Sequence, residues 1–343
     1  MEGNSTFSDV MFRAQVIVAT QPKSMPSDDP ADFTLETAQN LCRKQRYRFI
    51  RRLGYGGEAH VYMVQDRKGQ YHALRIGKKA YTSSEDYTWK SPLVAQAGLL
   101  RHVRVMSELH KMRTDRGLPS LIPLVYSIGY HKLGERAVPF ADLEYLPGEA
   151  VTRQKLMVPD ALAMGIDVAE ALTMYHELFP HRDVKPDNII HEQGVASRLI
   201  DLGRQDYIKK GIVCTVAYAA PEVIFEEWIS EYAVDLRHEL ETRRDIYALG
   251  ITLYRQLTGR LPFAKQDPKK KSSMDYYKED VYPVIAHRNF PALDTLVDVP
   301  VELSNLVNEC LDPDPFERPS AGLLSMDLQQ IARNNRIEIP YYS

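Results

Sequence analysis

Alternating hydrophobic and polar residues predict a small β-sheet in the first half of the chain. Arg48 to Leu53 has the pattern of a strand that enters a glycine-rich turn, and two short strands follow, joined by a turn at 66–69. Short runs rich in β-branched and aromatic residues between turn residues are typical of antiparallel hairpins. The strands expected in this half are 48–53, 61–64, 71–76, 121–128 and 137–145.

Apolar residues recur at helical spacing elsewhere in the chain. Leu99, Val103 and Met106 indicate one helix in the first half, and beyond Pro147 the pattern is mostly helical. One of the later helices is almost wholly apolar, which predicts a buried central position. Strands first and helices later predict an α+β fold with two lobes. The expected helices are 91–112, 159–177, 246–257 and 301–311.

The same patterns divide the chain into four parts. Residues 1–46 lack sustained periodicity, and the prolines, serines and aspartates at 22–30 indicate a flexible or loosely docked arm. A sheet lobe with one helix is expected at 47–146 and a mainly helical lobe at 147–335. Residues 336–343 remain as a short tail.

Composition and charge narrow the class of protein. The 343 residues are 44% hydrophobic and 26% charged, which is ordinary for a globular protein. The formal net charge of −3 argues against nucleic acid as a partner. The three cysteines, Cys42, Cys214 and Cys310, are too few and too far apart for a disulfide framework or a zinc site. A reducing, cytoplasmic compartment is therefore expected.

Membrane association is not expected either. The apolar stretch at 16–19 is too short for a signal peptide or a membrane span. The lysine run at 269–271 lies beside Asp267 and Glu279, so a solvated loop is favoured over a membrane patch.

A glycine-rich turn between two expected strands is a candidate phosphate cradle. Gly54, Gly56 and Gly57 form part of a G-x-G-x-x-A pattern that ends at Ala59. Glycines let the backbone approach phosphate groups closely. The third glycine of the usual pattern is missing, so an ordinary hairpin turn is about as well supported by these residues alone.

Polar residues at 181–188 could carry phosphoryl transfer, which needs positioned charge more than covalent chemistry. Asp183 can accept a hydroxyl proton, and Lys185 can neutralise the transferring group. The side-chain oxygen of Asn188 suits Mg²⁺, a hard cation. Asp201 follows an apolar pair and precedes Leu202-Gly203, so it is a candidate second metal ligand.

These motifs resemble those of the eukaryotic-type protein kinases across residues 49–332. Eight consecutive matching positions at 181–188, with Asp201 at the expected distance, make a chance polar loop a poor alternative. The resemblance implies that Glu222 pairs with Arg318 and that Asp245 braces the catalytic loop.

The resemblance also implies ATP and Mg²⁺ as cofactors and a protein as the substrate. Backbone groups of Glu144 and Leu146 are expected to meet the adenine. The apolar side chains that would sandwich the adenine ring are those of Val61, Ala73 and Ile190.

Two features are similar to serine/threonine kinases rather than tyrosine kinases. Lys185 and Pro186 follow the candidate base, and Thr215 stands seven residues before Glu222. The resemblance implies that Thr215 is bonded to the base and to the lysine. A simple strand residue is the alternative for Thr215.

The ATP-binding part of the first lobe departs from the family pattern. Arg75 stands where the family has a lysine that contacts the α- and β-phosphates, and His102 aligns with the carboxylate that pairs with this lysine. Arginine keeps the charge, but its planar fork does not replace an ammonium group in geometry. Arg75 is still expected to contact phosphate, with slow or impaired turnover.

Two regions bear on regulation and partners. Between Leu202 and Cys214 the only hydroxyl group is that of Tyr207, so control by Ser/Thr phosphorylation in this stretch is not expected. Arg182, which contacts a loop phosphate in the family, is expected to meet Asp206 instead. The acidic segment 224–243 is interpreted as a solvated helix, with a docking surface for a basic partner as the alternative.

The leading hypothesis is an ATP- and Mg-dependent Ser/Thr protein kinase. A pseudokinase that acts as an interaction module is the first alternative, motivated by Ala59, Arg75 and His102. A small-molecule kinase of similar fold is the second, and Thr215 with Ala220-Pro221-Glu222 argues against it.

Overall fold

In the computed structural model the chain forms two compact units. The sheet unit holds residues 30–77 and 124–146, and the helical unit holds 121–123 and the described residues from 147 onwards. Together they confirm the α+β, two-lobed architecture. The described residues are 30–55, 59–77, 121–133, 136–153, 155–177, 180–192, 194–201, 216–223, 234–263, 283–284, 287 and 289–339.

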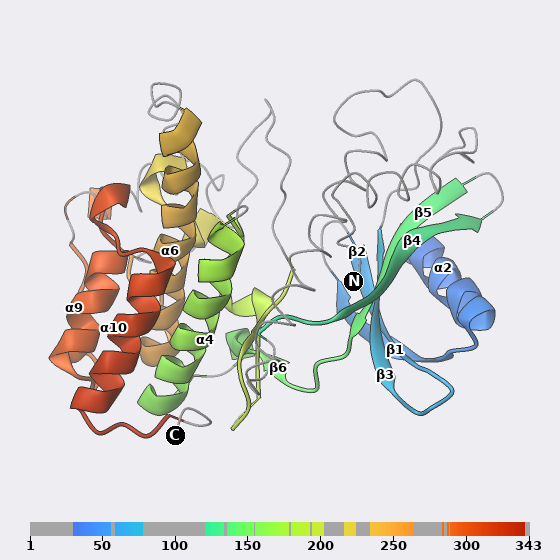
Figure 1. The fold of residues 1–343 in the computed structure, drawn as a ribbon, viewed down its shortest axis with the longest axis horizontal. Helices are drawn as coiled ribbons and strands as arrows, with labels where there is room; N and C mark the ends of the chain where they lie inside the picture. The colour runs from blue at the N-terminus through green and yellow to red at the C-terminus, as the bar shows by residue number, and fades with distance from the viewer. Residues whose placement is uncertain are drawn as a thin grey trace, which may run out of the picture. The chain divides into compact units, whose positions relative to one another are not determined.

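The sheet unit contains an antiparallel sheet in the order β1-β2-β3-β5-β4 (Figure 1). Its strands are β1 (Arg48–Tyr55), β2 (Ala59–Gln65), β3 (Tyr71–Gly77), β4 (Val125–Leu133) and β5 (Arg136–Glu144). Strand β4 begins later than the expected residue 121 because Leu121 and Ile122 are buried in the helical unit instead. There the carbonyl of Leu121 accepts a hydrogen bond from Leu199 N at 2.9 Å.

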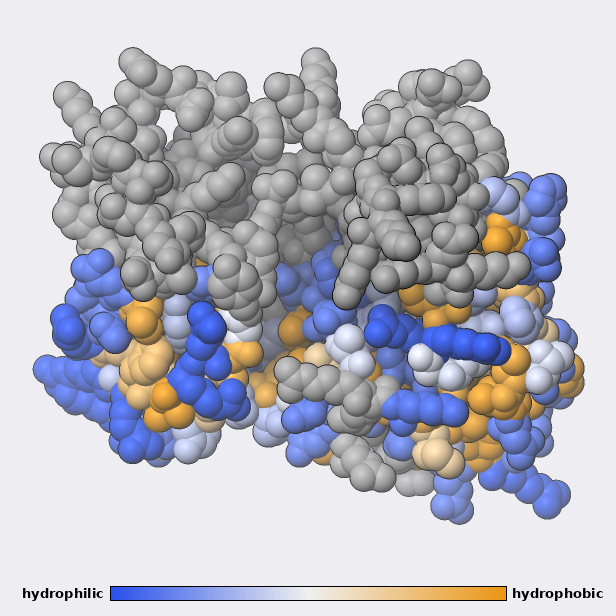
Figure 2. Space-filling view, turned by 180° about the vertical axis from the view of Figure 1, so that it is seen from behind, coloured by the Kyte–Doolittle hydropathy of each residue, from blue (hydrophilic) through white to orange (hydrophobic). Residues whose placement is uncertain are grey.

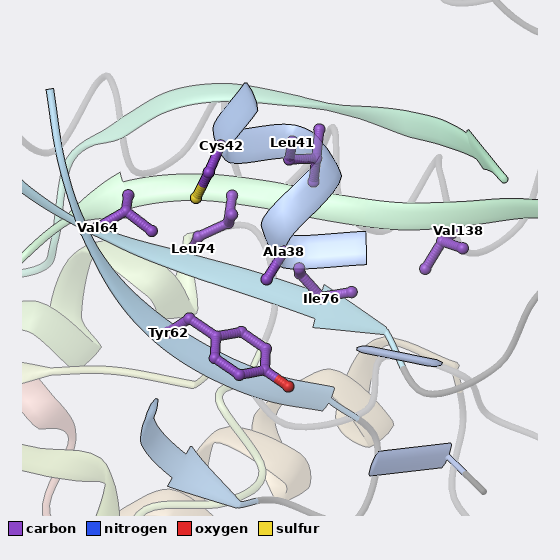
Figure 3. Close-up of a cluster of buried hydrophobic side chains, with 8 residues drawn as sticks. All are labelled: Ala38, Leu41, Cys42, Tyr62, Val64, Leu74, Ile76 and Val138. Atoms are coloured by element: carbon purple, nitrogen blue, oxygen red, sulfur yellow. The ribbon is translucent and has the colours of Figure 1, made fainter. Parts of the chain in front are cut away.

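Helix α2 (Pro30–Gln45) lies across one face of this sheet (Figure 1). Ala38, Leu41 and Cys42 of the helix are at most 4% exposed, and Figure 3 shows them directed at buried side chains of the sheet. Those sheet residues are Tyr62, Val64, Leu74, Ile76 and Val138.

The expectation of a flexible or loosely docked arm at 1–46 is therefore wrong for residues 30–45. Pro30 begins the helix, a position that proline tolerates because the first N–H groups of a helix have no intrahelical partner. The buried face consists partly of Thr34, Thr37 and Ala38, which give a weak hydrophobic pattern in the sequence. Thr34 Oγ1 also lies 2.9 Å from the hydroxyl of Tyr62, so a polar contact joins helix and sheet.

We expect Leu41→Ala to lower the free energy of unfolding by about 2–5 kcal/mol, since it leaves a cavity between α2 and the sheet. Leu35→Ala on the same helix is the matched control, because Leu35 is 36% exposed. Urea unfolding measures both. Equal, small effects of the two variants would contradict the integral role of α2.

In the described part of the helical unit, the longest helices lie side by side (Figure 1). They are α4 (Val158–His176), α6 (Val234–Thr258), α9 (Val301–Cys310) and α10 (Ala321–Asn334). Helices α4 and α9 confirm the predicted segments. Gly250 lets α6 approach α9, since a Cβ at this position would lie 2.7 Å from the Cβ of Cys310.

Helix α6 starts at Val234, well before the predicted start at residue 246. Its first turns are polar, so the apolar pattern revealed only the later part. A small sheet completes this unit, with strands β6 (Glu149–Ala150), β7 (Ile189–His191) and β8 (Arg198–Leu199) in antiparallel pairs.

Exposed apolar residues are scattered over the described surface. Figure 2 shows hydrophobic residues in separate groups between hydrophilic ones on the face in view. Scattered apolar residues of this kind are normal at a protein surface. The most exposed are Met157, Met326, Val301 and Leu323. Among the described helices, none is both long enough and apolar enough to cross a membrane.

Candidate active site

The catalytic loop of the helical unit is fixed by a buried carboxylate on α6. Asp245 accepts hydrogen bonds from the backbone N–H groups of His181 at 2.6 Å and Arg182 at 2.7 Å. His176 Nε2 lies 3.0 Å from the same carboxylate. The expectation that Asp245 braces the catalytic loop is confirmed. The brace is needed because Arg182 has φ of +69°, a conformation that a non-glycine residue adopts only when other contacts hold it.

His181 lies fully buried inside the loop. Burial lowers its pKa, and the carboxylates of Asp245 and Asp183 oppose that shift. Its Nδ1 accepts from the backbone N–H of Asp183 at 3.3 Å. The neutral imidazole therefore holds the backbone of the residue that carries the candidate base.

The carboxylate of Asp183 is held by two side chains of the same loop. Its Oδ2 lies 2.7 Å from Lys185 Nζ and 2.9 Å from Asn188 Nδ2. Both donors have limited exposure, and the side chain of Asp183 is 23% exposed. The carboxylate is thus fixed in direction and still reachable from solvent.

Asn188 is oriented as a metal ligand should be. Its Nδ2 donates to the carbonyl oxygen of Asp183 at 2.8 Å and to the Asp183 carboxylate, so the amide nitrogen must face these acceptors. The side-chain oxygen consequently points the other way. An amide oxygen in this orientation suits Mg²⁺.

Asp201 lies at the same end of the β7–β8 hairpin as Asn188. Strands β7 and β8 pair through Ile189 and Leu199, and Ile200 N donates to the carbonyl of Asn188 at 2.8 Å. Asp201 follows directly, is exposed and has φ of +54°. The two candidate ligands are therefore brought together by the hairpin, and the donor set of an amide and a carboxylate fits Mg²⁺. Ile190, on β7, pairs with Ala150 and Arg198.

A buried ion pair joins two distant parts of the helical unit. Arg318 contacts both carboxylate oxygens of Glu222, at 2.7 and 2.9 Å, and both residues are at most 2% exposed. The guanidinium also lies over the ring of Tyr247, 4.8 Å from its centroid. The expected Glu222–Arg318 pair is confirmed.

In the sheet unit, the side chains expected to meet ATP share one face of the sheet. Val61 is paired with Arg75 across β2 and β3, and Ala73 is two residues from Arg75 on β3. Residues directly opposite in an antiparallel pair point to the same face, as do alternate residues of one strand. Leu74 and Ile76 alternate with Ala73 and Arg75 along β3, and they contribute to the core under α2. Helix α2 therefore covers the face opposite to Val61, Ala73 and Arg75.

The expected adenine-binding backbone lies at the end of β5. The N–H of Glu144 donates to the carbonyl of Leu124 at 2.8 Å, so this N–H is already used within the sheet unit. Leu146 follows outside any helix or strand and is of intermediate exposure. Gly54, near the end of β1, is paired with Val61. The roles of these residues toward ATP stay predictions.

Several predicted residues lie outside the part of the chain that the structure describes. The candidate site residues among them are Gly56, Gly57 and Thr215. The expected helix at 91–112 with His102, the residues Asp206 and Tyr207, and the lysine run at 269–271 also lie outside.

The partner of Arg182 among the described residues was not expected from the sequence. Arg182 Nη2 lies 2.5 Å from Glu241 Oε2, and the Glu241 side chain is 5% exposed. Glu241 belongs to the acidic segment 224–243 that was interpreted as a solvated helix, and for this residue that interpretation is wrong. The four-residue spacing from Asp245, which puts both carboxylates on one face of a helix, was the signal available.

Comparison with known proteins agrees with this geometry. The family model of the protein kinase domain matches residues 47–330, which is more than half of the chain. The chain belongs to the protein kinase family.

Relatives of this kinase domain include named serine/threonine kinases of bacteria. Serine/threonine-protein kinase pkn2 of Myxococcus xanthus is 27% identical over 296 residues, covering 82% of this chain and 32% of the relative. PknB of Mycolicibacterium smegmatis is 24% identical over 326 residues, covering 89% of this chain and 46% of the relative. The kinase domain thus matches less than half the length of either relative.

A solved structure supports the fold. The kinase domain is similar to Rad53 in a complex with AMP-PNP, with a TM-score of 0.56 and 20% sequence identity. The match covers 83% of this chain and 67% of the Rad53 chain. At this level of identity the likeness concerns the fold alone.

Proposed function

We propose that this kinase domain transfers the γ-phosphoryl group of ATP to a serine or threonine hydroxyl of a protein, with Mg²⁺ as the metal. The observation that carries the proposal is the fixed carboxylate of Asp183, held by Lys185 and Asn188 on a loop that α6 anchors through Asp245. A protein that only binds partners has no need for this arrangement. The serine/threonine relatives and the Lys185-Pro186 pair support the substrate class.

Each residue has a role in this proposal. When bound, ATP supplies the phosphoryl group and Mg²⁺ neutralises the charge that develops on it. Asp183 accepts the proton of the acceptor hydroxyl, and Lys185 offers a positive charge beside it. Asn188 and Asp201 hold the metal through their side-chain oxygens.

The sheet unit contributes the contacts to the nucleotide. Val61 and Ala73 offer apolar contacts to the adenine, Gly54 belongs to the phosphate loop, and Arg75 binds phosphate oxygens. The backbone groups of Glu144 and Leu146 at the end of β5 are proposed to meet the adenine. In the helical unit, Ile190 contributes a further apolar contact.

A second candidate function is that of a pseudokinase, and Arg75 favours it. A guanidinium presents a planar fork of donors, whereas the family's lysine acts as a compact point charge on the phosphates. A domain of this kind would bind nucleotide and transfer its γ-phosphoryl group slowly or not at all.

Transfer of labelled phosphate from ATP to casein and histone, with and without EDTA, tests the two functions. We expect wild-type protein to label serine and threonine and to lose this activity with EDTA, because Asn188 and Asp201 would lack their metal. Arg75→Lys is the comparison variant. Transfer by Arg75→Lys without any transfer by the wild type would favour the pseudokinase, and no transfer by either, with no thermal shift by ATP, would remove the kinase proposal.

A further inference from the structure

Two carboxylates of α6 reach the same stretch of the catalytic loop. Asp245 accepts from the backbone of Arg182, and Glu241 is paired with the guanidinium of the same residue. The two acids are four residues apart, which is about one helical turn, so they project from one face of α6. Arg182 is therefore held at its backbone and at its side chain by a single rigid element.

The Arg182–Glu241 pair is well shielded from water. The side chain of Arg182 is 20% exposed and that of Glu241 is 5% exposed, and their closest atoms are 2.5 Å apart. A charge-assisted hydrogen bond at this distance is among the stronger contacts in a protein. Loss of one partner would leave a charge in a poorly hydrated place, so the pair stabilises this conformation of the loop.

The charges around the pair partly offset the effect of burial on the Glu241 carboxyl. Burial raises the pKa of the Glu241 carboxyl, and the guanidinium of Arg182 is the strongest influence that opposes this rise. Arg244 on α6 acts in the same direction, whereas Asp245 adds to the rise. Two cations and one anion thus act on the carboxyl, and the two cations offset part of the rise in its pKa that burial causes.

The Arg182–Glu241 pair includes the residue that stands next to the candidate base in the sequence. Arg182 directly precedes Asp183, and its positive φ sets the direction in which the chain enters the candidate base. The backbone of Arg182 therefore helps to set the position from which the Asp183 side chain projects. In the family that the chain resembles, a phosphate on the activation segment usually meets this arginine, whereas here a carboxylate of the chain itself does so.

We infer that Glu241 is a built-in counter-ion that positions Arg182, and through it Asp183, without a phosphate on the activation segment. Glu241 acts as a positioning residue, since it reaches the reacting atoms only through Arg182. The inference deepens the proposed function and rests on it.

Glu241→Gln tests the inference, with Glu239→Gln as the matched control. Glu239 is also on α6 and also paired with an arginine, Arg243, at 2.9 Å, but its side chain is 44% exposed. It stands two residues before Glu241, so it projects from another face of the helix. We expect Glu241→Gln to lower kcat by about 10- to 100-fold, because small misplacements of a catalytic group cost rate steeply. The KM for ATP and all parameters of Glu239→Gln should stay within about twofold of the wild type.

Two further measurements separate positioning from simple loss of stability. The charge swap Arg182→Glu with Glu241→Arg should recover part of the kcat that each single exchange loses. Treatment of the wild-type protein with a phosphatase should leave kcat unchanged. An unchanged kcat in Glu241→Gln, or a tenfold loss after phosphatase treatment, would overturn the inference.

Amide hydrogen exchange gives a readout that does not depend on turnover. The amides of Arg182 and Asp183 should exchange faster in Glu241→Gln and at the wild-type rate in Glu239→Gln. If the wild type transfers no phosphate, the proposed function fails, and the exchange rates still decide whether Glu241 holds the loop. Equal exchange in both variants would contradict the positioning role.

Discussion

Exchange of Asp183 for asparagine is expected to lower the kcat of phosphoryl transfer by about 10²- to 10⁴-fold, the usual contribution of a positioned general base. The asparagine side chain can still accept the hydrogen bonds that Lys185 and Asn188 donate to the Asp183 carboxylate. It cannot take up the hydroxyl proton. The loss should therefore appear in kcat, with the KM for ATP nearly unchanged.

Asp187→Asn is the control for this experiment. Asp187 belongs to the same loop and is exposed. It carries the same charge, so the variant removes the same charge from the same segment without touching the base. Steady-state kinetics with a peptide substrate measures both variants, and matching urea midpoints show that folding is intact. A fall in kcat of less than fivefold in Asp183→Asn would remove Asp183 from its catalytic role.

Replacement of Arg318 by alanine should lower the free energy of unfolding of the helical unit by about 3–5 kcal/mol, because it leaves the Glu222 carboxylate buried without a partner. The side chain of Arg318 is fully buried and that of Glu222 is 2% exposed. The guanidinium also donates to the carbonyl oxygens of Asp312, Pro313 and Arg243, and these acceptors would lose a donor as well.

A double exchange tests whether the cost comes from the unpaired charge. Arg318→Met with Glu222→Leu removes both charges and keeps much of the volume, so it should cost less than Arg318→Ala alone. Glu239→Ala, which breaks an ion pair at the surface of α6, should cost no more than about 1 kcal/mol. Urea unfolding measures all three proteins. An effect of Arg318→Ala as small as that of Glu239→Ala would contradict the structural role of the pair.

The local patterns of the chain were sufficient for β1, β2, β3 and β5 and for α4 and α9. Strands 48–53, 61–64 and 71–76 all lie within β1, β2 and β3. Strand β3 buries alternate residues and α4 buries mostly apolar ones, and both patterns are visible in a sequence. The catalytic loop was equally visible, because its residues are consecutive and their chemistry depends on short spacing.

The hydrophobic pattern of the sequence did not predict elements whose buried face is only weakly apolar. Helix α2 buries Thr34, Thr37 and Ala38, so its periodicity is weak although it covers the sheet. Leu121 and Ile122 have the composition of a strand but are buried in the other unit. The same apolar residue can serve a sheet or a helical core, and only the long-range contacts decide which.

The sequence alone determined the family, the two-lobed architecture and the identity of Asp183, Lys185, Asn188 and Asp201 as the candidate chemistry, because these signals are local. The tertiary structure decided how that chemistry is held. The docking of α2 on the sheet and the contact of Glu241 with Arg182 join residues that are far apart in the chain. Such contacts depend on how helices pack, so they leave no signal in the order of the residues around the loop itself.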